Sequence, residues 1–150
     1  MSTDPEPLLA LNAPCPCGGG AFSSASSSAT DGLTYGACCA RWHSGAQHLQ
    51  APTAESLMRS RYSAFVLGLH DYLLATWHPR TRPATLGPDE PGLRWLGLHV
   101  KQHRPIDADH ATVEFVARSK FGGRAQRMHE VSRFERDAQG HWLYIDGEVD

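Results

Sequence analysis

The stretch Cys15-Pro16-Cys17-Gly18-Gly19-Gly20 stands near the start of the chain, and the adjacent pair Cys38-Cys39 follows it. These are the only 4 cysteines among 150 residues. Thiolates are soft ligands, and four of them satisfy the tetrahedral preference of Zn²⁺. The glycines after Cys17 allow a sharp turn, so that backbone amides can point at the sulfurs. We therefore predict that the N-terminal third is a zinc knuckle attached to a separate packed module.

Other interpretations of the cysteines stay open, because common zinc sites use C-x2-C pairs, whereas here one pair is C-x-C and the other is adjacent. They could be unrelated buried thiols or form disulfides. The first residues carry Asp4 and Glu6 but no basic segment, and 8–11 is too short for a signal-peptide core. A reducing, cytoplasmic location is expected, where structural disulfides are rare. In a further alternative, His43 or His48 replaces one thiolate.

The segment from Thr53 to about Leu69 has the apolar periodicity of a helix packed against a core. Thr53 is expected to cap this helix after a linker over 40–52. Arg61 falls within or beside the apolar sector, where a guanidinium must find a carboxylate or reach water. Arg59 lies nearer the opposite edge and is expected to be solvated. The apolar face consists of Met58, Tyr62, Phe65, Val66 and Leu69.

A short helix over 72–77, capped by Asp71, and a proline-containing loop over 80–92 are predicted next. Residues 96–101 and 113–118 then alternate between apolar and other side chains, as strands do. The rest of the chain is therefore expected to form a sheet.

Gly122-Gly123 has the composition of a two-residue hairpin turn and predicts a register for the strands around it. With Phe121 opposite Arg124, Phe115 lies opposite Glu130. The same register pairs Val113 with Ser132 and Ala117 with Met128. Glu130 thereby falls on the apolar face, which we expect to be the concave face under the helices. After a turn at 137–140, the last strand is predicted over 142–145.

Arg61 and Glu130 are directed toward one interior by two independent patterns. We expect them to form a buried or half-buried ion pair that lines a pocket, with Tyr62, Trp77 and His78 around it. The pair is either the polar end of a ligand site or a structural bond between helix and sheet. The sequence contains no G-x-S-x-G, P-loop or H-E-x-x-H motif, and no catalytic residue is assigned.

A run of motifs resembles known proteins over nearly the whole chain. One part resembles the SEC-C metal-binding motif, which is the zinc tail of the SecA translocation ATPase. It consists of Cys15-Pro16-Cys17-Gly18, Tyr35 and Cys38-Cys39. The segments that resemble the YchJ family of small bacterial proteins are 57–65, 76–79, 95–98, 129–134 and 142–147. The resemblance implies a cone-shaped α+β domain similar to nuclear transport factor 2, with N-terminal helices packed on a curved antiparallel sheet and preceded by the zinc knuckle.

The resemblance also implies an organisation and a function. We expect a disordered N-terminus over 1–13, a knuckle over 14–44 and the α+β domain over 52–150. A Ser/Ala-rich insertion at 21–32 is expected to be a flexible excursion that leaves the knuckle intact. The SEC-C module of SecA engages the ribosome and the chaperone SecB. It implies a protein-docking or chaperone-like role near nascent or exported chains.

Two further functions remain: a catalytic or small-ligand pocket in the α+β domain, and zinc as a staple for an N-terminus too small to fold alone. Docking or stapling is favoured over catalysis, because four thiolates leave no ligand position for a substrate water. A formal net charge of −2 without basic runs argues against direct nucleic-acid binding. No apolar stretch approaches the roughly 18 residues of a membrane span.

Overall fold

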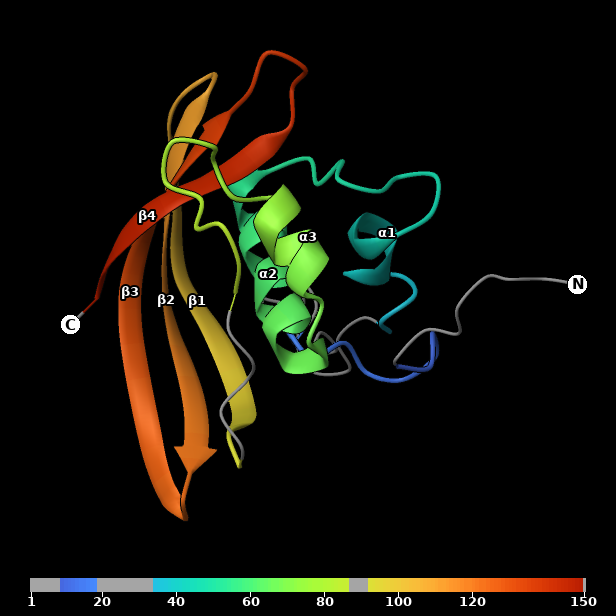
Figure 1. The fold of residues 1–150 in the computed structure, drawn as a ribbon, viewed down its shortest axis with the longest axis vertical. Helices are drawn as coiled ribbons and strands as arrows, with labels where there is room; N and C mark the ends of the chain where they lie inside the picture. Colours follow the sequence, from blue (N-terminus) through green and yellow to red (C-terminus); the bar gives the residue numbers. More distant parts are fainter. Residues whose placement is uncertain (1–8, 19–33, 87–91, 150) are drawn as a thin grey trace, which may run out of the picture.

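The computed structural model describes residues 9–18, 34–86 and 92–149. Within them, three helices and four strands follow one another: α1 (Ala40–His43), α2 (Ala54–Leu67), α3 (His70–Ala75), β1 (Arg94–Asp107), β2 (His110–Phe121), β3 (Arg124–Arg136) and β4 (Trp142–Val149). The strands form one antiparallel sheet in the order β1-β2-β3-β4. This curved sheet wraps around α2 and α3, while α1 lies on the far side of the helices (Figure 1). The predicted α+β class is confirmed.

The helix α2 begins where the sequence predicts. The side-chain oxygen of Thr53 accepts a hydrogen bond from the Ser56 amide at 3.0 Å, which caps the first turn. Gly68 ends the helix at φ 74°, a left-handed conformation that glycine adopts without strain. The next helix, α3, starts earlier than the predicted 72–77, because this turn brings the Leu69 carbonyl within 3.1 Å of the Leu73 amide. The linker expected over 40–52 contains the short helix α1.

The hairpin between β2 and β3 has the predicted turn and register. Both turn glycines have positive φ, 59° at Gly122 and 81° at Gly123. The observed partners are Phe121 with Arg124, Ala117 with Met128, Phe115 with Glu130 and Val113 with Ser132. Glu130 is therefore on the concave face, among apolar side chains.

The two edge strands, β1 and β4, differ from the alternation of apolar and polar side chains and from the bounds that the sequence predicts. In β1 the pairing shifts between Trp95 and Gly97, which leaves Leu96 52% exposed and lets Trp95 face the helices instead. The strand β4 continues through Val149, beyond the predicted 142–145. Its Asp146 side chain binds Arg133 across the strands, with both bonds at 2.6 Å.

The core lies between the concave face of the sheet and the two helices α2 and α3. Its largest fully buried apolar side chains are Leu57, Leu73, Val113 and Phe134. Each is 2% exposed or less, so their burial accounts for much of the stability of this packing. None of the described helices is long and apolar enough to cross a membrane.

The first described residues form an N-terminal lobe, defined here as 9–18 together with 34–44. The amides of Tyr35 and Gly36 donate to the carbonyls of Ala13 and Leu11, each at 2.8 Å. Of the stretch 1–13 for which disorder is predicted, 1–8 lies outside the described residues, and so does the insertion at 21–32.

Candidate metal centre and ligand pocket

The four cysteines gather in one cluster within the N-terminal lobe. Their sulfur atoms all lie within 4.8 Å of one another. The Sγ atoms of Cys17 and Cys38 are 3.6 Å apart and those of Cys38 and Cys39 are 3.9 Å apart. Sulfurs bound tetrahedrally to zinc at about 2.3 Å are separated by about 3.8 Å. The cluster therefore fits a single ion, and all four cysteines are free thiols rather than disulfides.

Two turns bring the sulfurs together. In the first, the Gly18 amide donates to the Cys15 carbonyl at 3.0 Å, and Gly18 has a φ of 82°. In the second, the Cys38 amide donates to the Tyr35 carbonyl at 3.0 Å. An isolated β-bridge between Pro14 and Thr34 holds the two turns side by side.

The cluster is buried, and its thiols shift one another's pKa values. Cys17 is 0% and Cys39 is 1% exposed. The neighbouring thiols lower the pKa of Cys15, whereas they and burial raise the pKa of Cys39. Four buried thiolates repel one another unless a cation compensates their charge. A soft, tetrahedral donor set of this kind suits Zn²⁺, which would hold the two turns together as a structural centre.

The cluster is packed directly against α2. The Ser63 hydroxyl lies 3.3 Å from the sulfur of Cys39 and 3.6 Å from that of Cys15. Arg59 donates from Nη1 to the Cys17 carbonyl at 2.9 Å and binds Glu55 at 3.0 Å. The prediction that Arg59 is solvated is wrong: it is 7% exposed, because the N-terminal lobe covers that edge of the helix.

The histidine alternative for the ligand set is not supported. His43 uses both ring nitrogens, with Nε2 donating to the Ser60 carbonyl at 2.8 Å and Nδ1 accepting from the Tyr35 hydroxyl at 2.6 Å. Burial lowers the pKa of His43, which favours this neutral form. The His48 ring lies beside Tyr72, at 6.2 Å between centroids. Among the described residues, the group that could hold a metal contains the four cysteines alone.

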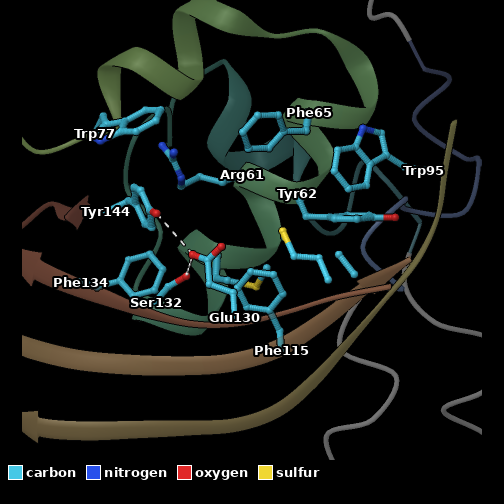
Figure 2. Close-up of a pocket in the computed structure, with 13 residues that line it drawn as sticks. Arg61, Tyr62, Phe65, Trp77, Trp95, Phe115, Glu130, Ser132, Phe134 and Tyr144 are labelled. Atoms are coloured by element: carbon cyan, nitrogen blue, oxygen red, sulfur yellow. Dashed lines mark hydrogen bonds between the residues drawn. The ribbon is translucent and has the colours of Figure 1, made fainter. Parts of the chain in front are cut away.

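A second feature is a pocket between α2 and the concave face of the sheet, with a volume of about 250 Å³ (Figure 2). Most of its lining is aromatic or aliphatic. Four of the five predicted pocket residues line it, namely Arg61, Tyr62, Trp77 and Glu130.

The fifth candidate, His78, is not among the lining residues. Its amide donates to the Tyr144 carbonyl at 2.7 Å, next to a bridge between Trp77 and Tyr144. Successive side chains of extended backbone point in opposite directions, so Trp77 enters the pocket and His78 turns away. The His78 ring lies 3.5 Å from Glu135 instead.

Arg61 brings a buried cation into the pocket. It is 6% exposed, and its Nη1 donates to the Leu73 carbonyl at 2.8 Å and to the Thr76 hydroxyl at 2.7 Å. The guanidinium carbon lies 4.6 Å from the ring centroid of Tyr144 and 5.0 Å from that of Trp77, which are cation–π distances. Burial lowers the pKa of Arg61 to about 10, so the side chain remains charged at neutral pH.

Glu130 brings an acidic group to the opposite wall. Its Oε2 accepts hydrogen bonds from the hydroxyls of Ser132 at 2.5 Å and Tyr144 at 3.3 Å. Burial raises the pKa of Tyr144 to about 12, and the negative charge of the nearby Glu130 is the second contribution. The phenol therefore keeps its proton and can donate.

The expected direct ion pair between Arg61 and Glu130 is wrong. No ion pair joins them in the part of the chain that the structure describes, because Arg61 donates from Nη1 to the Leu73 carbonyl and the Thr76 hydroxyl instead. Tyr144 connects the two groups, with its ring under the guanidinium and its hydroxyl on the carboxylate (Figure 2).

Comparison with known proteins agrees with this architecture. Residues 53–147 match the model of the middle, nuclear-transport-factor-2-like domain of YchJ. The chain belongs to the YchJ family. The resemblance noted from the sequence is thus confirmed, and it covers the domain that carries the pocket.

Individual relatives of this YchJ-family chain span most of its length. It is 58% identical over 137 residues to a UPF0225 protein of Methylibium petroleiphilum, covering 91% of the chain and 89% of the relative. It is 53% identical over 137 residues to one of Bordetella parapertussis, covering 91% and 93%. A crystal structure of a SEC-C motif containing protein from Psychrobacter arcticus is 34% identical, with a TM-score of 0.69, over 91% of this chain and 82% of that one.

Several residues around Glu130 in this YchJ-family chain carry little signal in the sequence. The hairpin register places Ser132 opposite Val113 but does not indicate that its hydroxyl donates to Glu130. Tyr144 cannot be placed from the sequence, because no local pattern fixes the register of the last strand. Gly147 gave no signal, although the Glu130 side chain lies directly over it.

Gly147 is expected to be required for the position of Glu130. A Cβ atom at 147 would overlap Glu130 Oε2 and lie 2.7 Å from its Cδ. Gly147→Ala should therefore displace the carboxylate and lower the free energy of unfolding, measured in urea, by about 1–3 kcal/mol. Gly97→Ala in β1 is the matched control, because a Cβ there meets nothing within 4 Å. Equal effects of the two substitutions would contradict this position of Glu130.

Proposed function

We propose that this YchJ-family protein binds a small, largely apolar molecule with a polar head in the pocket between α2 and the sheet. The observation that carries the proposal is that Arg61 and Glu130 are both buried in this pocket without neutralising each other. Buried charges are costly unless they are paired, and such groups mark binding sites more often than other positions. An apolar pocket with a few convergent polar groups is the usual form of a small-molecule site.

In this proposal, zinc bound by Cys15, Cys17, Cys38 and Cys39 has a structural role. Four thiolates would fill its coordination sphere and leave no position for a substrate. The lobe that carries them is fastened to α2 through Ser63 and Arg59. The SEC-C motif named for the Psychrobacter arcticus structure, together with the soft donor set here, supports the choice of zinc.

The pocket is tested by filling it. Ala117 is 2% exposed and lines the pocket, so Ala117→Phe would place a ring inside it. Indole is the probe, and its binding is followed by ligand-detected NMR. We expect the unmodified protein to bind indole with a Kd on the order of 1 mM.

The control is Arg118→Phe, which adds the same ring at the neighbouring, exposed position. Ala117→Phe should weaken indole binding at least tenfold, and Arg118→Phe should leave it unchanged. Absence of indole binding to the unmodified protein, or equal binding by the two folded variants, would contradict a ligand site in this pocket.

Docking of proteins through the N-terminal lobe is a second candidate, in line with the ribosome, SecB or exported chains that the SEC-C resemblance implies. One observation favours it: Leu11 is 55% exposed on a turn held by the bond from the Gly36 amide to its carbonyl. Leu11→Asp should reduce co-sedimentation with ribosomes or binding to purified SecB. Leu96→Asp is the control, because Leu96 is similarly exposed on β1. If neither partner binds the unmodified protein, this candidate fails.

A further inference from the structure

We propose that the pocket selects a zwitterionic molecule with no net charge, of the class of free amino acids with an apolar side chain. Its carboxylate would bind Arg61 and its ammonium group would bind Glu130. This inference rests on the proposed function, because it names the ligand class of the same pocket.

Arg61 has donors left for an anion. A guanidinium carries five N–H donors, and within the described residues only Nη1 donates, to Leu73 and Thr76. The Tyr144 and Trp77 rings contact the guanidinium and hold it in place. A held, planar guanidinium with unused N–H groups suits a carboxylate, which it can bind through two parallel hydrogen bonds.

Glu130 has an oxygen left for a cation. Both of its described hydrogen bonds, from Ser132 and Tyr144, end on Oε2, while Oε1 accepts none within the described residues. The space above Gly147 and the two hydroxyl donors fix the carboxylate. An ammonium group with three donors can therefore bind Oε1 without displacing either hydroxyl.

The charge of the pocket favours a ligand that is neutral overall. Of the described residues that line it, only Arg61 and Glu130 are charged, and their charges have opposite sign. A ligand with one charge would pair with one of them and leave the other buried without a partner. A zwitterion compensates both charges, and Tyr144 keeps the two sites apart so that they do not pair with each other.

The remainder of the pocket suits an apolar body. Tyr62 and Phe65 pack against Trp95, with ring centroids 5.7 Å and 6.1 Å from it, on the side of the pocket away from Trp77 (Figure 2). Phe65 is 37% exposed and marks the more open side. A volume of about 250 Å³ limits the ligand to the size of a small metabolite.

Four probes that share one body and differ in charge test the inference: indole, tryptamine, indole-3-propionate and L-tryptophan. Binding to the full-length protein is measured by isothermal titration calorimetry at pH 7 and low salt. We expect L-tryptophan to bind at least tenfold more tightly than each of the other three. Glu130→Gln should weaken L-tryptophan and tryptamine at least fivefold and leave indole-3-propionate unweakened.

Arg61→Met supplies the reciprocal variant and should weaken L-tryptophan and indole-3-propionate but not tryptamine. If this variant does not fold, Glu130→Gln alone still tests the ligand class, because it should weaken the binding of the two ligands that carry an ammonium group and not that of indole-3-propionate. Binding of indole without any preference for L-tryptophan would overturn the ligand class while leaving the pocket as a binding site. Absence of binding by all four probes would overturn both the ligand class and the proposed function.

Discussion

Replacing Cys38 and Cys39 by serine is expected to abolish the proposed zinc binding and to lower the free energy of unfolding by more than about 4 kcal/mol. The loss should extend beyond the N-terminal lobe, because the sulfur of Cys39 contacts Ser63 in the middle of α2. Elemental analysis should find one zinc per chain in the unmodified protein and none in the double variant. Urea unfolding followed by circular dichroism measures the loss of stability.

Two matched controls separate ligation from packing. Ser63→Ala removes a hydroxyl that touches two sulfurs, and His43→Asn removes a buried imidazole, yet neither residue belongs to the cysteine cluster. Both variants should keep one zinc per chain. A strong chelator added to the unmodified protein should reproduce the instability of the double variant. Purified protein without zinc, or a double variant as stable as the parent, would contradict a structural zinc centre.

Replacing Arg61 by glutamate is expected to lower the free energy of unfolding by about 3–5 kcal/mol. The substitution places a second carboxyl group at a position that is 6% exposed, in the same pocket as Glu130. It also removes the donor to the Leu73 carbonyl and the contact with the Tyr144 ring. Chemical denaturation at pH 7 measures the effect.

Arg61→Met is the matched control, since methionine fills a similar space without charge. It should cost only about 1–2 kcal/mol, because the Leu73 carbonyl can share the Thr76 hydroxyl, which donates to the Tyr72 carbonyl at 2.8 Å and lies 3.3 Å from that of Leu73. The contrast between the two variants therefore measures the effect of charge rather than of shape. Similar losses of stability for both would mean that position 61 is solvated in solution, and that the pocket is not a low-dielectric site.

The arrangement of charge in the pocket favours a ligand-binding role for Arg61 and Glu130 over a purely structural one. A direct ion pair would satisfy Arg61 and Glu130 and leave nothing for a ligand. Instead, Arg61 is held by α3 and Glu130 by Ser132 and Tyr144, so within the described part of the chain each keeps unused hydrogen-bonding capacity. This separation is the physical basis of the ligand-binding proposal.

The sequence by itself determined the features that depend on neighbouring residues. Thr53 starts α2, and the glycines at 122 and 123 set the register that places Glu130 on the concave face. Each depends on a cap, a turn or a period of two, which are local properties of the chain. The two cysteine pairs likewise predicted one cluster, because soft ligands have few other uses in that arrangement.

Only the tertiary structure decided what lies against each predicted face. The helical periodicity identifies Arg61 as inward-facing but does not show that its side chain binds the end of α3. The same periodicity predicts that Arg59 is solvated, because a local pattern contains no information about the N-terminal lobe that covers this side chain. Tyr144 and Gly147 complete the surroundings of Glu130 from the neighbouring edge strand β4. Such contacts join segments distant in sequence, and packing geometry, rather than any local pattern, selects them.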